Sequence, residues 1–160
     1  GGVALTASRG KAERVGFGFR AETENRAFAG VVDKAKIPLE LPVRVIGLNP
    51  NWAAGVWRDG QDLLAPVAPD PEGVSWITVN PAKQPGPFWV GNVLTCENPD
   101  VLLRIFKRPD GGWDILAHNP RDETLTVTVR GNSGGPVPKL ERKLKLPAGA
   151  EQVFAWQPVH

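Results

Sequence analysis

The chain has 160 residues and a formal net charge of +2, and its basic residues never run longer than pairs, so the sequence does not support a nucleic-acid partner. Hydrophobic residues make up 41% and charged residues 22%, which is ordinary globular usage and argues against a disordered chain. No apolar run reaches the ~18 residues of a transmembrane helix, and we expect no membrane span.

The length suits one domain, which we expect to cover residues 1–160. Cys96 is the single cysteine, so the chain has no intrachain disulfide and no cysteine-based metal cluster. The chain begins with Gly-Gly and contains no Met, which is expected of a piece excised or cleaved from a larger protein.

Apolar residues recur with a period of two along most of the chain. The first clear case is "IPLELPVRVIGL" at 37–48, and its alternation places Ile37, Leu39, Leu41, Val43 and Val45 on one face. Counting the similar short segments, each bounded by Pro, Gly or Asn, gives ten to twelve strands. The sequence therefore predicts an all-β fold, an antiparallel β-sandwich with little helix.

Two segments leave helix and strand open. "NWAAGVW" at 51–57 is the best helix candidate, although it is too short for more than a turn or two. "NPDVLLRIF" has a start that could cap a helix, but its Val, Ile and Phe favour a strand. The Pro109-Asp110-Gly111-Gly112 stretch of "KRPDGGWDI" predicts a hairpin turn between two strands, and we expect His118 to end a strand.

Six Trp without any Tyr form the most unusual part of the composition. We expect Trp76, Trp89 and Trp156 to fill the core of the sandwich. Trp52 and Trp57 instead lie in the polar, Gly-rich stretch "LNPNWAAGVWRDGQD". Indole rings there can stack on a sugar ring while nearby polar groups bind its hydroxyls, and a loop that plugs the end of the sandwich is the alternative. The predicted ligand-binding residues are Asn51, Trp52, Trp57, Arg58 and Asp59.

The stretch "GNSGGPV" at 131–137 resembles the sequence around the nucleophile of trypsin-like serine proteases, which would make Ser133 the nucleophile. That mechanism needs a histidine base well before the serine. His118 precedes Ser133 by only fifteen residues, and His160 follows it. We therefore interpret the stretch as a turn between two alternating runs.

Acidic pairs offer the other route to catalysis. Asp59 with Asp62, or Asp70 with Glu72, could act in glycoside hydrolysis, but both pairs lie in polar loops that favour solvated carboxylates. Two distant His residues make no metal-ligand pair. The sequence thus predicts no catalytic residue, no metal site and no cofactor, and it favours a role other than that of an enzyme.

Three stretches carry a resemblance: "VIGLNPNWAAGVW", "ILAHNPRDETLTVTVRG" and the closing "LKLPAGAEQVF". They are similar to β-sandwich accessory domains found late in large secreted bacterial proteins, often glycan-degrading enzymes. The resemblance covers the last third of the chain and, more loosely, the Trp-bearing loop. It implies a non-catalytic sandwich beside a catalytic neighbour.

These observations together predict a secreted bacterial binding module whose partner is a polysaccharide or a neighbouring catalytic domain. Two alternatives stay open. One is a hydrolase, either a glycoside hydrolase or a serine protease. The other is a subunit of an extracellular assembly that pairs through an edge strand.

Overall fold

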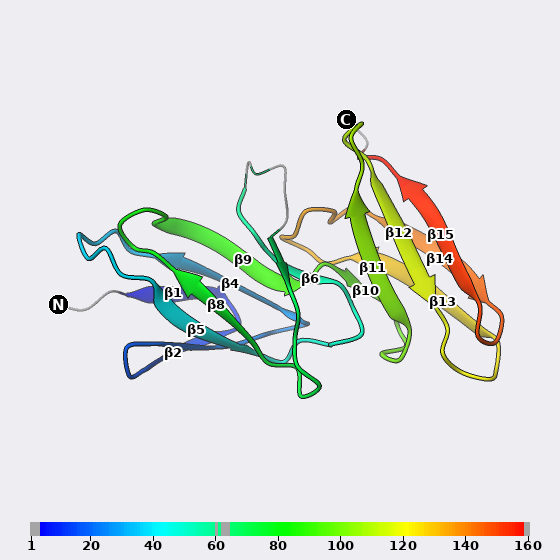
Figure 1. Ribbon diagram of the computed structural model, residues 1–160, viewed down its shortest axis with the longest axis horizontal. Coiled ribbons are helices and arrows are strands. Elements are labelled where there is room, and N and C mark those ends of the chain that lie inside the picture. Colours follow the sequence, from blue (N-terminus) through cyan, green and yellow to red (C-terminus); the bar gives the residue numbers. More distant parts are fainter. Residues whose placement is uncertain (1–3, 60, 62–64, 159–160) are drawn as a thin grey trace. The chain divides into compact units, whose positions relative to one another are not determined.

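The computed structural model describes residues 4–59, 61 and 65–158, and these residues form fifteen β-strands and no helix (Figure 1). The strands belong to two compact units, of which the first comprises Gly1–Pro50 with Ala54–Gly91 and the second Asn51–Ala53 with Asn92–His160. The predicted all-β antiparallel sandwich with little helix is confirmed, with more strands than expected. The single domain expected over residues 1–160 stays a prediction.

The first unit contains two sheets. The five-stranded sheet has the order β1 (Leu5–Arg9), β4 (Ala27–Val32), β9 (Gly86–Asn92), β6 (Ala54–Trp57) and β7 (Ala65–Val67). The four-stranded sheet has the order β2 (Lys11–Val15), β3 (Gly18–Glu22), β5 (Leu41–Ile46) and β8 (Ser75–Val79). Within the described residues, every pair of strands with a defined register is antiparallel except β3 and β5.

The core of the first unit lies between these two sheets, whose layers are visible in Figure 1. Alternate residues of β5 and β8 point inward, as the period of two predicts. Val43 and Val45 of β5 thereby meet Phe28 of β4 and Phe88 of β9, and the two Phe rings lie 5.9 Å apart. The opposite face of the four-stranded sheet is left to the solvent.

Gly10 carries the chain from one sheet of the first unit to the other. It separates β1 from β2 with a φ of +80°, a conformation that favours glycine. A Cβ at this position would lie 2.1 Å from the backbone oxygen of Glu22, so no side chain fits.

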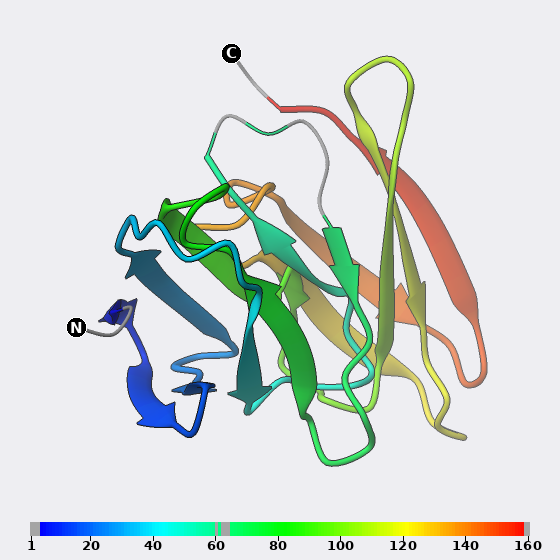
Figure 2. The same cartoon turned by 60° about the vertical axis from the view of Figure 1, so that its left-hand side comes forward.

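The second unit contains two three-stranded sheets. One has the order β10 (Leu94–Thr95), β13 (Leu125–Gly131) and β14 (Glu141–Leu146), and the other has the order β11 (Leu102–Lys107), β12 (Trp113–His118) and β15 (Glu151–Trp156). Figure 2 shows red β15 and yellow-green β11 and β12 in one layer, with yellow β13 and orange β14 behind it. Buried side chains of both sheets form the core, among them Leu103, Ile115, Val129 and Leu146.

Several sequence predictions are confirmed in the second unit. The turn at 109–112 joins β11 to β12, which pair antiparallel from Leu102 opposite His118 to Lys107 opposite Trp113. His118 is the last residue of β12, and the segment beginning at Asn98 forms strand rather than helix.

Other predictions need correction. The alternation at 37–48 yields a strand only from Leu41, and both Ile37 and Leu39 are exposed outside it. The helix candidate at 51–57 is wrong, because its second half is strand β6. The run "FWVGNVLTC" is interrupted at Val93, whose backbone N–H donates to the oxygen of Ala53 at 2.8 Å.

The three Trp expected in the core differ from one another. Trp89 is buried and Trp156 is half-buried, whereas Trp76 is 65% exposed, so the prediction for Trp76 is wrong. The reason is its position in β8, where Ile77 and Val79 point inward and Trp76 therefore points outward.

Candidate functional site

Asn51 and Trp52 belong to the second unit, where they form part of its framework. Trp52 is only 6% exposed and forms a parallel bridge with Leu103. The side-chain amide of Asn51 donates to the backbone oxygen of Pro99 at 3.0 Å. Both residues hold the 51–53 segment against β11, and Trp52 presents little surface to a ligand.

Trp57, Arg58 and Asp59 belong to the first unit, so no single unit holds all five predicted ligand-binding residues. The Arg58 guanidinium lies 5.6 Å from the centre of the Phe88 ring and donates to the oxygen of Pro87 at 3.3 Å. Its burial lowers the pKa of Arg58 from the ordinary value. Trp57 is half-buried and Asp59 is exposed. Ligand binding at these five residues stays a prediction.

Ser133 lies in an exposed turn between β13 and β14. His118 lies on β12, in the other sheet of the second unit. His160 falls outside the described residues. The predicted turn is therefore confirmed.

The acidic pairs occupy loops. The Asp70 carboxylate accepts from the backbone N–H groups of Glu72 and Val74 at 2.9 and 3.0 Å, and thereby closes a turn. Asp59 and Glu72 are exposed, and Asp62 lies outside the described residues. Within residues 4–59, 61 and 65–158, no three His, Cys, Asp or Glu side chains gather as metal ligands would.

An aromatic groove on the outer face of the four-stranded sheet is a candidate site. Its volume is about 270 Å³. Its aromatic members include Phe17, which is 89% exposed, and Trp76. Its lining residues are Val15, Phe17, Gly18, Phe19, Arg20, Pro42, Arg44 and Trp76. We call this the Trp76 groove.

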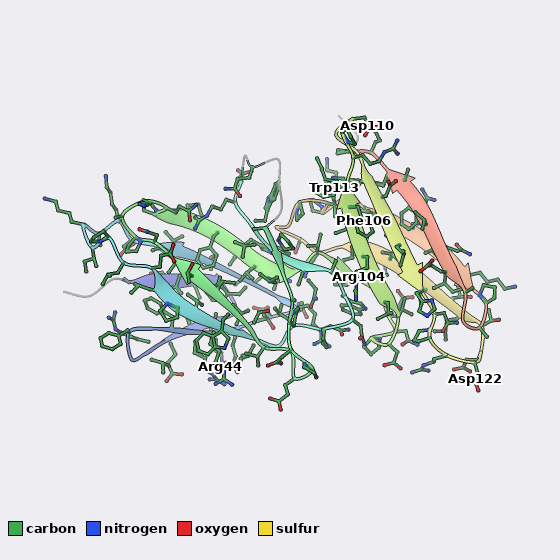
Figure 3. All side chains as sticks on the ribbon, viewed as in Figure 1. Arg44, Arg104, Phe106, Asp110, Trp113 and Asp122 are labelled. Carbon is green, nitrogen blue, oxygen red and sulfur yellow. The ribbon has the colours of Figure 1, made fainter. Side chains whose placement is uncertain are left out.

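Strand register brings the groove's polar and aromatic side chains into one row. Arg44 of β5 lies directly opposite Trp76 of β8, and Arg20 of β3 lies on the other side of Arg44. Glu13 of β2 lies opposite Arg20 and ends the row. Directly opposite residues have Cβ atoms about 4.5–5.5 Å apart in antiparallel pairs. Figure 3 shows the Arg44 side chain extending away from the sheet.

A tight turn places Phe17 beside this row. Gly16 and Phe17 join β2 to β3, and φ is +57° at Gly16, as in a type II′ hairpin turn. Gly18 then allows β3 to approach β5, because a Cβ there would lie 2.0 Å from the oxygen of Pro42. The two glycines therefore shape this end of the groove.

The charges in the groove are positive. Arg20 and Arg44 are its charged lining residues. Arg20 lies 3.8 Å from Glu13, and both side chains are well exposed, so this ion pair is weak and screened by salt. Arg44 is exposed and forms no ion pair or hydrogen bond with any residue that the structure describes.

A second exposed apolar surface occurs in the second unit, where Phe106 is 54% and Val153 61% exposed. Figure 3 shows Arg104 and Phe106 along β11. The Arg104 guanidinium donates to the backbone oxygens of Asn51 and Leu103, at 2.8 and 2.9 Å. The guanidinium of Arg104 is thus hydrogen-bonded within the fold, unlike the guanidinium of Arg44 in the Trp76 groove.

Sequence reasoning missed the Trp76 groove, although a signal was present. In the strand "SWITV", successive side chains point to opposite faces, so Trp76 and Thr78 lie on one face and Ile77 and Val79 lie on the other. In "PVRVI", Arg44 likewise alternates with two Val. The face that carries Ile and Val is the one that packs on the core. The alternation by itself therefore places Trp76 and Arg44 on the solvent-exposed face.

Comparisons with protein-family models, with curated proteins and with solved structures gave no match. Among the residues that the structure describes, no helix is long and apolar enough to cross a membrane.

Proposed function

We propose that the chain is a non-catalytic binding module of a secreted bacterial protein and that it binds glycan through the Trp76 groove. The resemblance of the last third of the sequence to accessory domains of glycan-degrading proteins supports this function. The aromatic and cationic residues that line the Trp76 groove support its assignment as the binding site.

The exposure of Trp76 is the observation that carries the proposal. An indole that is 65% exposed contributes little to the core and presents a flat apolar face to the solvent. Phe17 and Pro42 extend that face, and Arg44 supplies hydrogen-bond donors at its edge. Sugar rings combine apolar C–H faces with hydroxyl groups, and they fit a surface of this mixed character.

The rigidity of the groove also supports binding. Its residues lie on the paired strands β2, β3, β5 and β8 and on the two-residue turn between β2 and β3. A site on paired strands loses little conformational freedom when a ligand binds, and more of the contact energy is then available for affinity.

Trp57 provides a second predicted site for the same function, because its ring is half-buried rather than enclosed. Its neighbour Arg58 is held by Phe88 and Pro87 within the first unit. Because the Arg58 guanidinium already has these contacts, we favour the Trp76 groove over the loop at 57–59 as the binding site.

Affinity gel electrophoresis of the full chain against a panel of neutral and acidic polysaccharides tests the proposal. We expect at least one polysaccharide to retard the native chain. Trp76→Ala should abolish this retardation, whereas Trp57→Ala and the matched surface control Thr78→Ala should preserve it. Retardation of the native chain and Trp76→Ala to the same extent would contradict the groove. Absence of retardation by every polysaccharide would contradict glycan binding itself.

A further inference from the structure

We infer that the glycan bound in the Trp76 groove is acidic, with a carboxylate or sulfate group attached directly to the ring that stacks on Trp76. This inference rests on the proposed glycan-binding function and names its ligand class. Arg44 is the residue that would receive the anionic group.

The position of Arg44 is the first argument. Its strand partner is Trp76, and both side chains are on the exposed face of the sheet. Side chains of directly opposite residues are immediate neighbours. A substituent on a sugar ring that lies over the indole is therefore within reach of the guanidinium.

The free donors of Arg44 are the second argument. Its guanidinium has no hydrogen bond or ion pair with the described residues, in contrast to Arg58 and Arg104, which both donate to backbone oxygens. A planar guanidinium binds carboxylate or sulfate oxygens through two parallel hydrogen bonds. Arg44 can thus bind an anion without losing a hydrogen bond or ion pair within the protein.

The charge balance of the groove is the third argument. Arg20 follows Arg44 in the row, and no carboxylate is among the groove's lining residues. Glu13 lies one strand further out and holds Arg20 only at 3.8 Å in an exposed pair. Two neighbouring cations beside apolar lining residues complement a sugar ring that carries a negative charge better than an uncharged sugar ring.

Two pairs of polysaccharides, each with a charged and an uncharged member, test the inference. Polygalacturonate and its methyl ester compare a carboxylate with an uncharged ester, and dextran sulfate and dextran compare a sulfate ester with a hydroxyl group. Binding to the full chain is measured by isothermal titration calorimetry at two salt concentrations. Arg44→Gln removes the guanidinium, and Lys143→Gln, an exposed position on β14, is the control with the same change in net charge.

We expect the native chain to bind the charged member of at least one pair about 10- to 100-fold more tightly than the neutral member, as one charged hydrogen-bonded contact allows. Arg44→Gln should remove most of that difference, and Lys143→Gln should keep it. The pair that shows the difference identifies the group as carboxylate or sulfate. Thermal unfolding of each variant checks that its fold is intact.

Three results would overturn the inference. Equal affinity for both members of each pair, with dependence on Trp76, would leave the glycan-binding function in place and reject an acidic ligand. An equal loss in Arg44→Gln and Lys143→Gln would mean unspecific attraction to a polyanion. Tight binding of the charged member by Arg44→Gln would assign the anion to another residue.

Discussion

Arg44 and Trp76 face each other across the antiparallel strands β5 and β8, and both side chains project from the solvent side of the sheet. Their inward neighbours, Val43, Val45 and Ile77, belong to the core of the first unit. The same alternation therefore builds the core on one face and places a cation opposite an aromatic residue on the other.

Trp76→Ala should leave the stability of the protein almost unchanged. Trp76 is 65% exposed, and substitutions of such surface residues change the free energy of unfolding by about 0.5 kcal/mol or less. Trp89→Ala is the matched comparison, because Trp89 is 4% exposed and removing a buried Trp costs about 3–5 kcal/mol. Urea unfolding of both variants measures the difference. A large loss in Trp76→Ala would mean that this ring serves the fold.

Gly18→Ala should weaken the first unit and distort the groove. The added methyl group would meet the oxygen of Pro42 at 2.0 Å, and β3 and β5 must then move apart. Such overpacking costs about 1–3 kcal/mol. Hydrogen exchange of the β3 and β5 amides should accelerate relative to that of β13 and β14. Unchanged exchange in β3 would show that the two strands tolerate a side chain there.

The side chain of Asn119 should be essential to the second unit. It is fully buried, and its amide donates to the oxygens of Glu123 and Leu146 at 2.7 and 3.0 Å, while its oxygen accepts from the N–H of Arg121 at 2.9 Å. Asn119→Ala should lower the free energy of unfolding by about 2–4 kcal/mol, since each buried group left without a partner costs about 1–3 kcal/mol.

The variant Asn119→Asp should have a stability that depends on pH. The new carboxyl group would face the two backbone oxygens, and this raises its pKa in the folded state. The protonated form fits the site better, so the variant should be more destabilised at pH 7 than at pH 4 relative to the native chain. Equal destabilisation at both pH values would contradict this assignment.

Cys96 should make the stability of the protein fall at alkaline pH. Burial raises the pKa of its thiol, the charge of Glu97 adds to the increase, and a backbone hydrogen bond at Asn98 opposes both. A thiol whose pKa is raised by folding stabilises the folded state below its ordinary pKa, and this contribution is lost as the pH rises through the folded value.

Comparison with Cys96→Ala isolates this effect. The native chain should lose more stability than the variant between neutral pH and pH values above the ordinary pKa of the thiol. Alkylation by iodoacetamide should also be slower in the folded chain than in urea, because less thiolate is present. Parallel pH profiles of the two proteins would contradict the raised pKa.

The strands were the predictable part of this protein, because their signals are local. The turn residues Pro109 to Gly112 and the alternating run that follows His118 were sufficient to place β11, β12 and β13. The division into two units had no such signal. The segment 51–53, for example, belongs to the second unit and forms backbone hydrogen bonds with Leu103 and Val93, which are remote in sequence.

The Trp residues show why residue type alone does not tell which of the rings are exposed. Trp52 lies in a stretch rich in Gly and Asn, yet its bridge to Leu103, a contact remote in sequence, buries it. Trp76 is a large aromatic residue of the kind that fills sandwich interiors, so residue type alone predicts that it is buried. Its parity within "SWITV" pointed outward, and parity is the stronger signal because a one-residue shift moves every side chain to the other face.

The most direct test of the Trp76 groove is the response of the six Trp indole N–H signals to a bound glycan in an NMR titration of the full chain. Oligomers of polygalacturonate and of dextran sulfate are the ligands. We predict that the Trp76 indole signal and the backbone amides of Gly18 and Arg44 shift in a saturable manner, while the indole signal of the buried Trp89 does not. A saturable shift of Trp57, or of the amide of Phe106 in the second unit, with Trp76 unmoved would contradict the assignment of the ligand to the groove.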